Sequence, residues 1–334
     1  MALRVGIVGA GWIGGWHAAR WARLPITVAG FFDPDPDRAQ RAANTYGGQV
    51  FPSLEHLVQT VDIVHICSPT PFHRAGVLMA ADARKHVFCE KPLARTPADA
   101  QEMAAACERA GVRLFVGQVL RFFPQYVRAK QMIDAGAIGT PGLIHMVRGA
   151  GHPTGPEGRS WFESVEEAGG TIMEGGVHDL DYARWCLGDV DRVFARGITF
   201  RKDLSIVGDH TLVVLRFKGG AIGHIEGSWM VTDGRFRQQF EIAGDRGRLE
   251  YDSLPPEQLA ISLRADRRVP LLPQEPLAPH DDPYYAQLEH FLTCLNAEKD
   301  FRVSPQDGVE AVRLSVAALE SMRTGRVVQV EEVA

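Results

Sequence analysis

The chain has 334 residues, of which 45% are apolar and 23% are charged, and its formal net charge is -5. These values are typical of a globular protein with two ordinary domains and exclude disordered and fibrous classes. The 36 basic and 41 acidic residues are mixed without a run of lysine or arginine, which excludes nucleic acid as a main partner. No stretch approaches the roughly 18 apolar residues of a membrane span, and the start of the chain lacks a signal-peptide pattern. We therefore expect a cytoplasmic protein that does not bind a membrane.

The five cysteines are widely spaced and include no C-x-x-C pair. This spacing predicts neither a zinc site nor a redox motif, so we expect no metal. Cys67 and Cys89 lie in apolar runs and are expected to be buried thiols.

The first third of the chain alternates apolar, strand-like runs with amphipathic helical stretches. The expected strands are 3–8, 26–32, 62–69, 86–92 and 112–118, and the expected helices are 12–22, 35–47, 51–60, 73–85 and 96–111. Alternation of this kind predicts a parallel sheet covered on both faces. Residues 1–121 are therefore expected to form a doubly wound Rossmann domain of the α/β class.

From about Val147 the pattern changes to short strands separated by glycine turns such as KGG. The expected strands are 193–200, 210–217, 221–229 and 235–243, preceded by a helical stretch at 169–185 and followed by helices at 284–296 and 305–324. Residues 122–334 are therefore expected to form an α+β domain with an open, mostly antiparallel sheet. The last helix is free to pack back on the first domain.

A glycine-rich turn separates the first expected strand from the first expected helix. Gly9, Gly11 and Gly14 form G-x-G-x-x-G, which allows a tight turn, a close approach of the backbone to a pyrophosphate, and close packing of helix and strand. The amides of Trp12 and Ile13 are expected to face that pyrophosphate at the helix N-terminus. The alternative is a tight turn without a ligand.

An acidic residue ends the second expected strand. Asp33 lies 22 residues after Gly11, where a carboxylate would accept hydrogen bonds from the adenosine ribose and repel a 2′-phosphate. We therefore expect NAD as the cofactor. Arg38 and Arg41 follow closely enough to keep NADP as the less favoured alternative.

Further polar residues follow other strands of the expected parallel sheet. Ser68, Thr70 and His73 follow one strand and Gln118 ends another, which places them at the carboxyl edge where such folds bind ligands. We expect these four residues to contact the dinucleotide. A purely structural role for His73, in the first turn of a helix, is nearly as well supported.

Two later stretches carry groups suited to proton transfer. Glu90, Lys91 and Pro92 end a strand of the same sheet, which brings a lysine to the cofactor edge. We expect Glu90 and Lys91 to contact the cofactor. In GGTIMEGGVHDLDYARW, Glu174 and His178 are four residues apart, one turn along a helix. The alternative for that stretch is a solvated helix face.

In combination, AGWIGGWH, CSPTPFH, CEKPL, RFFP and GGTIMEGGVHDLDYARW resemble the glucose-fructose oxidoreductase, inositol dehydrogenase and MocA family over almost the whole chain. The resemblance implies a nicotinamide cofactor and hydride transfer at a carbinol carbon of a sugar, cyclitol or related polyol. It also implies a homo-oligomer, a dimer or tetramer, formed through the C-terminal sheet. In the family the Glu-Lys-Pro lysine is in the active site, often before a cis bond.

The resemblance also assigns roles within the opening of the second domain. His178 matches the family's active-site histidine and Asp181 the acid three residues beyond, whereas Glu174 stands where the family most often has aspartate. Alcohol oxidation releases a proton, so a base is needed within reach of the hydroxyl. We expect His178 as that base, Lys91 as the second partner of the oxygen, and Glu174 as an orienting or substrate-binding acid.

Two other residues are weaker candidates for substrate contacts. Arg121 lies just beyond the last Rossmann strand and Trp161 in a Gly/Pro-rich loop, and either is equally explained by packing. Two further functions are compatible with the sequence. One is a glycosidase that oxidises its sugar transiently with bound NAD, and the other is an NAD-binding regulatory protein without turnover.

Overall fold

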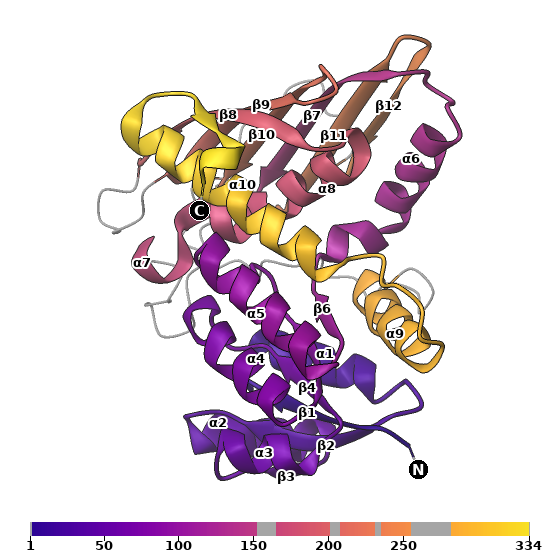
Figure 1. The fold of residues 1–334 in the computed structure, drawn as a ribbon, viewed down its shortest axis with the longest axis vertical. Coiled ribbons are helices and arrows are strands. Elements are labelled where there is room, and N and C mark those ends of the chain that lie inside the picture. The colour runs from indigo at the N-terminus through magenta and orange to yellow at the C-terminus, as the bar shows by residue number, and fades with distance from the viewer. Residues whose placement is uncertain (1, 152–164, 201–207, 231–234, 255–281, 334) are drawn as a thin grey trace. The chain divides into compact units, whose positions relative to one another are not determined.

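The chain forms two compact units in the computed structural model (Figure 1). The described residues are 2–151, 165–200, 208–230, 235–254 and 282–333. The first unit comprises Met1–Phe123 and Ala278–Glu310, and the second comprises Pro124–Leu277 and Ala311–Ala334. The units are therefore interleaved along the sequence, and the domain boundary near residue 121 stays a prediction.

The first unit is built on a six-stranded parallel sheet in the order β3-β2-β1-β4-β5-β6. Its strands are β1 (Arg4–Val8), β2 (Thr27–Phe32), β3 (Gln49–Val50), β4 (Ile63–Ile66), β5 (His86–Cys89) and β6 (Leu114–Val116). Strands β1 and β4 are adjacent although two others separate them in the chain, which gives the doubly wound topology. The predicted α/β class is confirmed. The nearly uniform burial of β4, β5 and β6 explains why their sequences are continuously apolar.

Helices surround this sheet. They are α1 (Trp12–Trp21), α2 (Pro36–Tyr46), α3 (Leu54–Thr60), α4 (His73–Asp82), α5 (Pro97–Ala110) and α9 (Pro283–Asn296), with 3-10 turns η1 (Thr70–Phe72) and η2 (Val119–Phe122). Helix α1 contacts α2 and α9, while α4 contacts α3 and α5. The predicted caps are present, since the Ser53 hydroxyl accepts the His56 N–H and the Thr96 hydroxyl accepts the Asp99 N–H.

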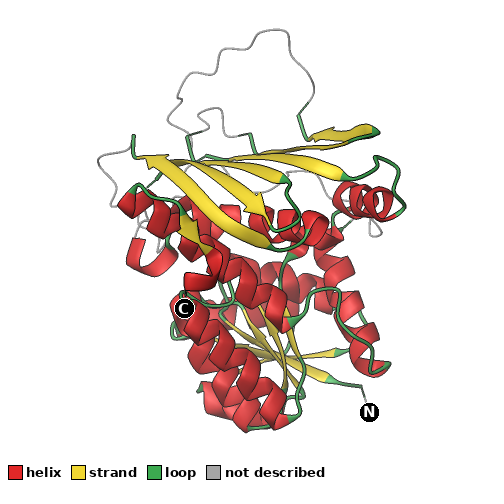
Figure 2. Ribbon diagram, turned by 45° about the horizontal axis from the view of Figure 1, so that its top comes forward, coloured by secondary structure: helices red, strands yellow, loops and turns green. Residues whose placement is uncertain are grey.

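The second unit is built on a seven-stranded sheet in the order β12-β11-β7-β10-β9-β8-β13. Its strands, yellow in Figure 2, are β7 (Pro141–Gly149), β8 (Val190–Ile198), β9 (His210–Phe217), β10 (Ile222–Ser228), β11 (Arg237–Gly244), β12 (Gly247–Asp252) and β13 (Val328–Gln329). The other described elements are α6 (Pro124–Asp134), α7 (Val165–Ala168), η4 (Ile172–Gly176), α8 (Val177–Leu187) and η5 (Val330–Glu332), while α10 (Pro305–Thr324) runs through residues of both units. The sheet is mostly antiparallel, but β10 pairs with β7 in parallel.

Part of this unit was not predicted from the sequence. No element was expected between 121 and 147, where the structure has α6 and the first half of β7, and β12 was also missed. The parallel pairing of β7 with β10 joins segments far apart in sequence, so no local turn announces it. The predicted KGG turn is present between β9 and β10, where Gly220 has a φ of 95° that favours glycine.

Candidate active site

The glycine-rich turn lies between β1 and α1, at the carboxyl edge of the parallel sheet. A Cβ atom on Gly14 would lie 2.0 Å from the carbonyl oxygen of Gly9, so only glycine lets α1 approach the end of β1 this closely. A Cβ atom on Gly11 would meet no described atom within 4 Å, so its backbone is open to a ligand. Gly11 is also the N-cap of α1 and provides no side-chain hydrogen bond to the first turn. These are the features that a pyrophosphate site needs.

Asp33 is held beside this turn. Its Oδ2 accepts the Ala10 N–H at 2.8 Å and its Oδ1 accepts the Asp35 N–H at 2.9 Å, so the carboxylate has a fixed orientation next to the turn. Arg38 lies 3.8 Å from Asp33 Oδ1 and 3.8 Å from Asp35 Oδ2, and Arg41 lies 4.0 Å from the same Asp35 oxygen. Both arginines therefore lie among carboxylates, which favours a ribose hydroxyl over a phosphate at this position.

Two polar side chains at the same edge fit a bound cofactor. The Ser68 hydroxyl follows β4, and both amide atoms of Gln118 follow β6. All three atoms are buried and, within the described part of the chain, have no hydrogen-bond partner. Because buried polar atoms are nearly always paired, a ligand with donors and acceptors is a natural explanation. Thr70, another of the four residues predicted here, is buried at the start of η1.

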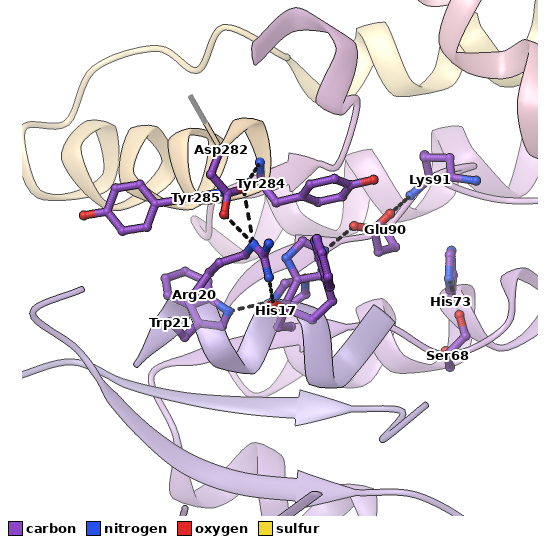
Figure 3. Close-up of polar contacts among 12 residues, drawn as sticks. His17, Arg20, Trp21, Ser68, His73, Glu90, Lys91, Asp282, Tyr284 and Tyr285 are labelled. Atoms are coloured by element: carbon purple, nitrogen blue, oxygen red, sulfur yellow. Dashed lines mark hydrogen bonds and ion pairs between the residues drawn. The ribbon is translucent and has the colours of Figure 1, made fainter. Parts of the chain in front are cut away.

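Lys91 follows β5, between the ends of β4 and β6 in the sheet order. The Lys91–Pro92 peptide bond is cis, as the resemblance implies. The carboxylate of Glu90 is buried, and its Oε2 accepts the Lys91 backbone N–H at 3.2 Å (Figure 3). Glu90 therefore contacts the main chain of the lysine, while its predicted contact with the cofactor stays a prediction.

His73 is buried beneath this loop. Its Nε2 lies 2.8 Å from the Ser68 carbonyl oxygen, and its Nδ1 lies 3.0 Å from that of Pro92 and 3.3 Å from that of Leu93. Burial lowers the pKa of His73 despite these carbonyl oxygens, which favour the protonated ring. The ring connects the loop after β4 to the loop after β5, which supports the structural alternative for this histidine.

Arg121 is also buried, in η2. Its guanidinium donates to the Arg302 carbonyl oxygen at 3.0 Å and to Asp307 Oδ2 at 3.2 Å. The charge of Arg121 helps to lower the pKa of Asp307, although burial acts in the opposite direction. These contacts tie the end of the sheet to residues 302–307 and support the packing alternative for Arg121.

The predicted proton-transfer stretch lies in the second unit. It is helical, but it begins with a π-helical turn, η4, before α8. Glu174 is buried in that turn and His178 is half-buried in the first turn of α8. A π turn is rare and frequently occurs at functional sites. The structure thus rejects the alternative of a fully solvated helix face.

A buried ion pair, which was not predicted from the sequence, fixes this stretch to the sheet. Arg148 of β7 donates to both oxygens of Asp179, with Nε 2.7 Å from Oδ2 and the NH2 nitrogen 2.9 Å from Oδ1. Burial raises the pKa of Asp179, while the charge and hydrogen bonds of Arg148 oppose that rise. Only an acid next to His178 was visible in the sequence, because its partner is 31 residues away. Asp181 is also buried.

Trp161 lies outside the described residues.

The five cysteines are free, and Cys67 and Cys89 are buried as predicted, where burial raises the pKa of both thiols. No helix in the described part of the chain is long and apolar enough to span a membrane.

Comparison with known proteins places this geometry in a family. Residues 3–118 match the model of an oxidoreductase family with an NAD-binding Rossmann fold, and residues 126–250 match the GFO/IDH/MocA C-terminal domain. The chain belongs to the Gfo/Idh/MocA family of oxidoreductases. It is 30% identical to the myo-inositol 2-dehydrogenase of Thermotoga maritima over 99% of each chain.

Solved structures agree with this membership in the Gfo/Idh/MocA family. A probable dehydrogenase from Thermotoga maritima aligns with a TM-score of 0.84 and 30% identity, covering 99% of this chain and 100% of that one. GenD2 from gentamicin A biosynthesis, solved in complex with NAD, aligns with a TM-score of 0.87 and 25% identity over 98% and 96% of the two chains.

The protein is therefore an NAD-dependent oxidoreductase that acts on CH–OH groups, as predicted. The contact of the glycine turn, Asp33, Ser68 and Gln118 with NAD stays a prediction. Neither the glycosidase nor the regulatory-protein alternative is supported, because these relatives are named for dehydrogenation.

Proposed function

We propose that this oxidoreductase removes a hydride from a carbinol carbon of a polyol, with an inositol as the first candidate substrate. One observation carries the assignment of the site: Ser68, Lys91 and Gln118 follow three adjacent strands of the parallel sheet, β4, β5 and β6. They therefore share the carboxyl edge where such folds bind their ligands. The name of the Thermotoga relative, a myo-inositol 2-dehydrogenase, supports the choice of substrate.

The chemistry divides between the cofactor and the chain. NAD would be held by the glycine turn, Asp33, Ser68 and Gln118, and would supply the hydride acceptor. The hydroxyl also loses its proton, and His178 takes that proton as the base. The ammonium group of Lys91 stabilises negative charge on the substrate oxygen. In the reverse direction, protonated His178 returns the proton to that oxygen. Glu174 orients the base or binds a neighbouring hydroxyl.

The glycine pair before His178 supports this role for the stretch. A Cβ atom on Gly175 would come no closer than 3.4 Å to a described atom, and one on Gly176 no closer than 3.7 Å. Neither glycine has a positive φ, so neither crowding nor backbone conformation requires a glycine there. Each disfavours a helix by about 1 kcal/mol relative to alanine. Close approach of a ligand to the backbone explains why both are present.

The test is a panel of inositols, aldoses and other polyols with NAD, followed by NADH absorbance. We expect turnover with at least one inositol, and a loss of roughly a hundredfold or more in Lys91→Ala and in His178→Ala. Lys299→Ala and His56→Ala, which change exposed residues of the same types, should retain wild-type turnover. Wild-type rates in both Lys91→Ala and His178→Ala would reject the proposed roles.

We also propose that the open face of the second sheet binds a second copy of the chain. Ile222 of β10 lies beside Leu143 of β7, and Val214 of β9 shares that face through its pairing with His224. The three apolar side chains are between 36% and 46% exposed. Contiguous exposed apolar side chains on a sheet favour association. Val214→Lys should reduce the molar mass measured by light scattering, and a monomeric wild type would reject the proposal.

A further inference from the structure

The residue before Lys91 has a buried partner on another element. The carboxylate of Glu90 bridges two groups: Oε1 lies 2.7 Å from Nε2 of His17 on α1, and Oε2 accepts the Lys91 backbone N–H at 3.2 Å (Figure 3). His17 has no exposed surface and Glu90 is 7% exposed. A single carboxylate thus connects α1 to the peptide of the lysine.

The neighbouring strand leaves room for this carboxylate. Gly117 follows β6, and a Cβ atom there would lie 3.0 Å from Oε1 of Glu90 and 3.2 Å from its Cδ. Any other residue would press on the carboxylate. The Gly117 N–H donates to the Cys89 carbonyl oxygen at 2.8 Å, which holds the glycine in this position. The ends of β5 and β6 are therefore shaped around an acid at position 90.

The electrostatics favour a charged carboxylate. Burial raises the pKa of Glu90, but the hydrogen bond and charge of His17, together with the Lys91 charge, outweigh it and leave the pKa below its usual value. The titratable groups that face Glu90 are His17 of α1, His73 of α4, Cys67 after β4, Cys89 at the end of β5, and Lys91 after it. A carboxylate only accepts hydrogen bonds, so Nε2 of His17 is the donor.

The other side of His17 is packed rather than hydrogen-bonded. Its Nδ1 is buried and has no partner among the described residues, and its ring centroid lies 4.5 Å from that of His65. Nδ1 of His65 accepts the Trp21 indole N–H at 2.8 Å. Burial lowers the pKa of His65 well below its usual value, so this ring is neutral.

This tautomer argues against a metal ion in the cluster. One ligand atom from each of His17, His65 and Glu90 lies within 4.8 Å of the others, which is a spacing that could suggest a cation site. However, an indole can only donate, so the lone pair of the neutral His65 ring points to Trp21. The Nε2 atom of His65 then carries the hydrogen and cannot bind a metal.

Helix α1 connects this cluster to the glycine turn. Its first residue, Trp12, follows the glycine turn, and His17 lies five residues further along the same helix. We propose that His17 is a positioning residue: it holds the Glu90 carboxylate in place, and Glu90 fixes the peptide of Lys91 relative to the helix that receives the pyrophosphate. This inference rests on the proposed role of Lys91.

The test compares His17→Phe, which keeps a ring but removes the donor, with His17→Gln, which keeps an N–H. In His17→Phe we expect kcat to fall roughly 10- to 100-fold, because small misplacements of reacting groups have effects of this size. NADH affinity, measured by fluorescence, should stay close to wild type. Without its donor, Glu90 takes up a proton at higher pH, so the acidic limb of kcat/KM should move to higher pH. His17→Gln should recover most of kcat.

His65→Phe is the matched control, since it removes a neighbouring buried histidine that makes its hydrogen bond to Trp21 and none to Glu90. It should lower Tm through loss of the Trp21 hydrogen bond, while the pH profile stays unchanged. The inference is overturned if His17→Phe, like His65→Phe, only lowers Tm and keeps the wild-type pH profile and kcat. His17 would then be a packing residue.

Hydrogen exchange separates this inference from the proposed function. The Lys91 N–H is donated to Glu90, so its exchange, followed by mass spectrometry, should accelerate in His17→Phe and remain slow in His65→Phe. This readout needs no substrate. Wild-type turnover in Lys91→Ala would reject the proposed function, whereas slow exchange in His17→Phe would reject the inference alone.

Discussion

The two groups of predicted site residues differ in how they are held. In the first unit, the glycine turn, Ser68, Lys91 and Gln118 are placed by main-chain geometry, because each follows a strand of one parallel sheet. In the second unit, the stretch around His178 is held by an ion pair between Arg148 and Asp179, which lie on elements far apart in the sequence. The first arrangement depends on backbone space and the second on buried charge.

This difference has a consequence for mutagenesis. The backbone of a site placed by strand ends should keep its fold through many side-chain changes. It should not keep its fold when a glycine that permits close backbone contact is replaced. A stretch held by a buried ion pair should be sensitive to the loss of one partner and less sensitive to the loss of both.

The largest effect is expected at the glycine turn, in Gly14→Ala. Alanine favours a helix by about 1 kcal/mol over glycine, but its Cβ would lie 2.0 Å from the Gly9 carbonyl oxygen. Because backbone must move, we expect about 3 kcal/mol of destabilisation and loss of detectable NADH binding. Urea denaturation and NADH fluorescence measure the two effects.

Gly11→Ala is the matched control for that turn. Its Cβ would meet no described atom within 4 Å, so the free energy of unfolding should change little. NADH binding should still weaken, since the methyl group enters the space open to the pyrophosphate. Equal losses of stability in the two variants would contradict the account of the turn.

The next effect concerns the buried pair in the second unit. Arg148→Leu leaves Asp179 buried without its cation, and we expect the free energy of unfolding to fall by about 3 to 5 kcal/mol at neutral pH. The pKa of Asp179 is already raised by burial and rises further without Arg148. A carboxyl whose pKa is raised in the folded state destabilises the fold as pH increases. The loss of unfolding free energy in Arg148→Leu should therefore be smaller in mild acid than at neutral pH.

The double variant Arg148→Leu with Asp179→Leu sharpens this test. Replacing both charges by apolar side chains removes the uncompensated carboxylate, so the double variant should be more stable than Arg148→Leu alone. Denaturation curves at neutral and mildly acidic pH provide the comparison. Losses that simply add, with no dependence on pH, would show that the pair does not act as a unit.

The smallest effect is expected for an exposed ion pair of the same sheet. Arg237 of β11 lies 2.6 Å from Asp252 of β12, and its hydrogen bond lowers the pKa of Asp252. Their side chains are 41% and 33% exposed, so Arg237→Ala should cost only about 0.5 kcal/mol. A carboxyl whose pKa is lowered by folding stabilises the folded state at pH values above its pKa in the unfolded chain. The stability difference between Arg237→Ala and the wild type should therefore disappear as the pH falls through the pKa of Asp252 in the folded state. An effect as large as that of Arg148→Leu would mean that burial does not decide between the two pairs.

Much of the fold, including the glycine turn, could be predicted from the sequence because it depends on local pattern. Alternating apolar runs, the G-x-G-x-x-G turn and the caps at Ser53 and Thr96 need only neighbouring residues. The contacts made by His17 and Arg148 could not be predicted in this way. The partner of His17 is 73 residues away and that of Arg148 is 31 residues away. Only the topology brings them together.

The central claim is tested most directly by following the hydride itself. A single turnover of the enzyme with NAD and an inositol deuterated at its carbinol carbons should transfer one deuterium to the nicotinamide, as measured by mass spectrometry. The deuterated substrate should also react more slowly than the ordinary one, and Lys91→Ala should form little labelled product. Release of the deuterium to water, or NADH that carries none, would contradict direct hydride transfer from the polyol.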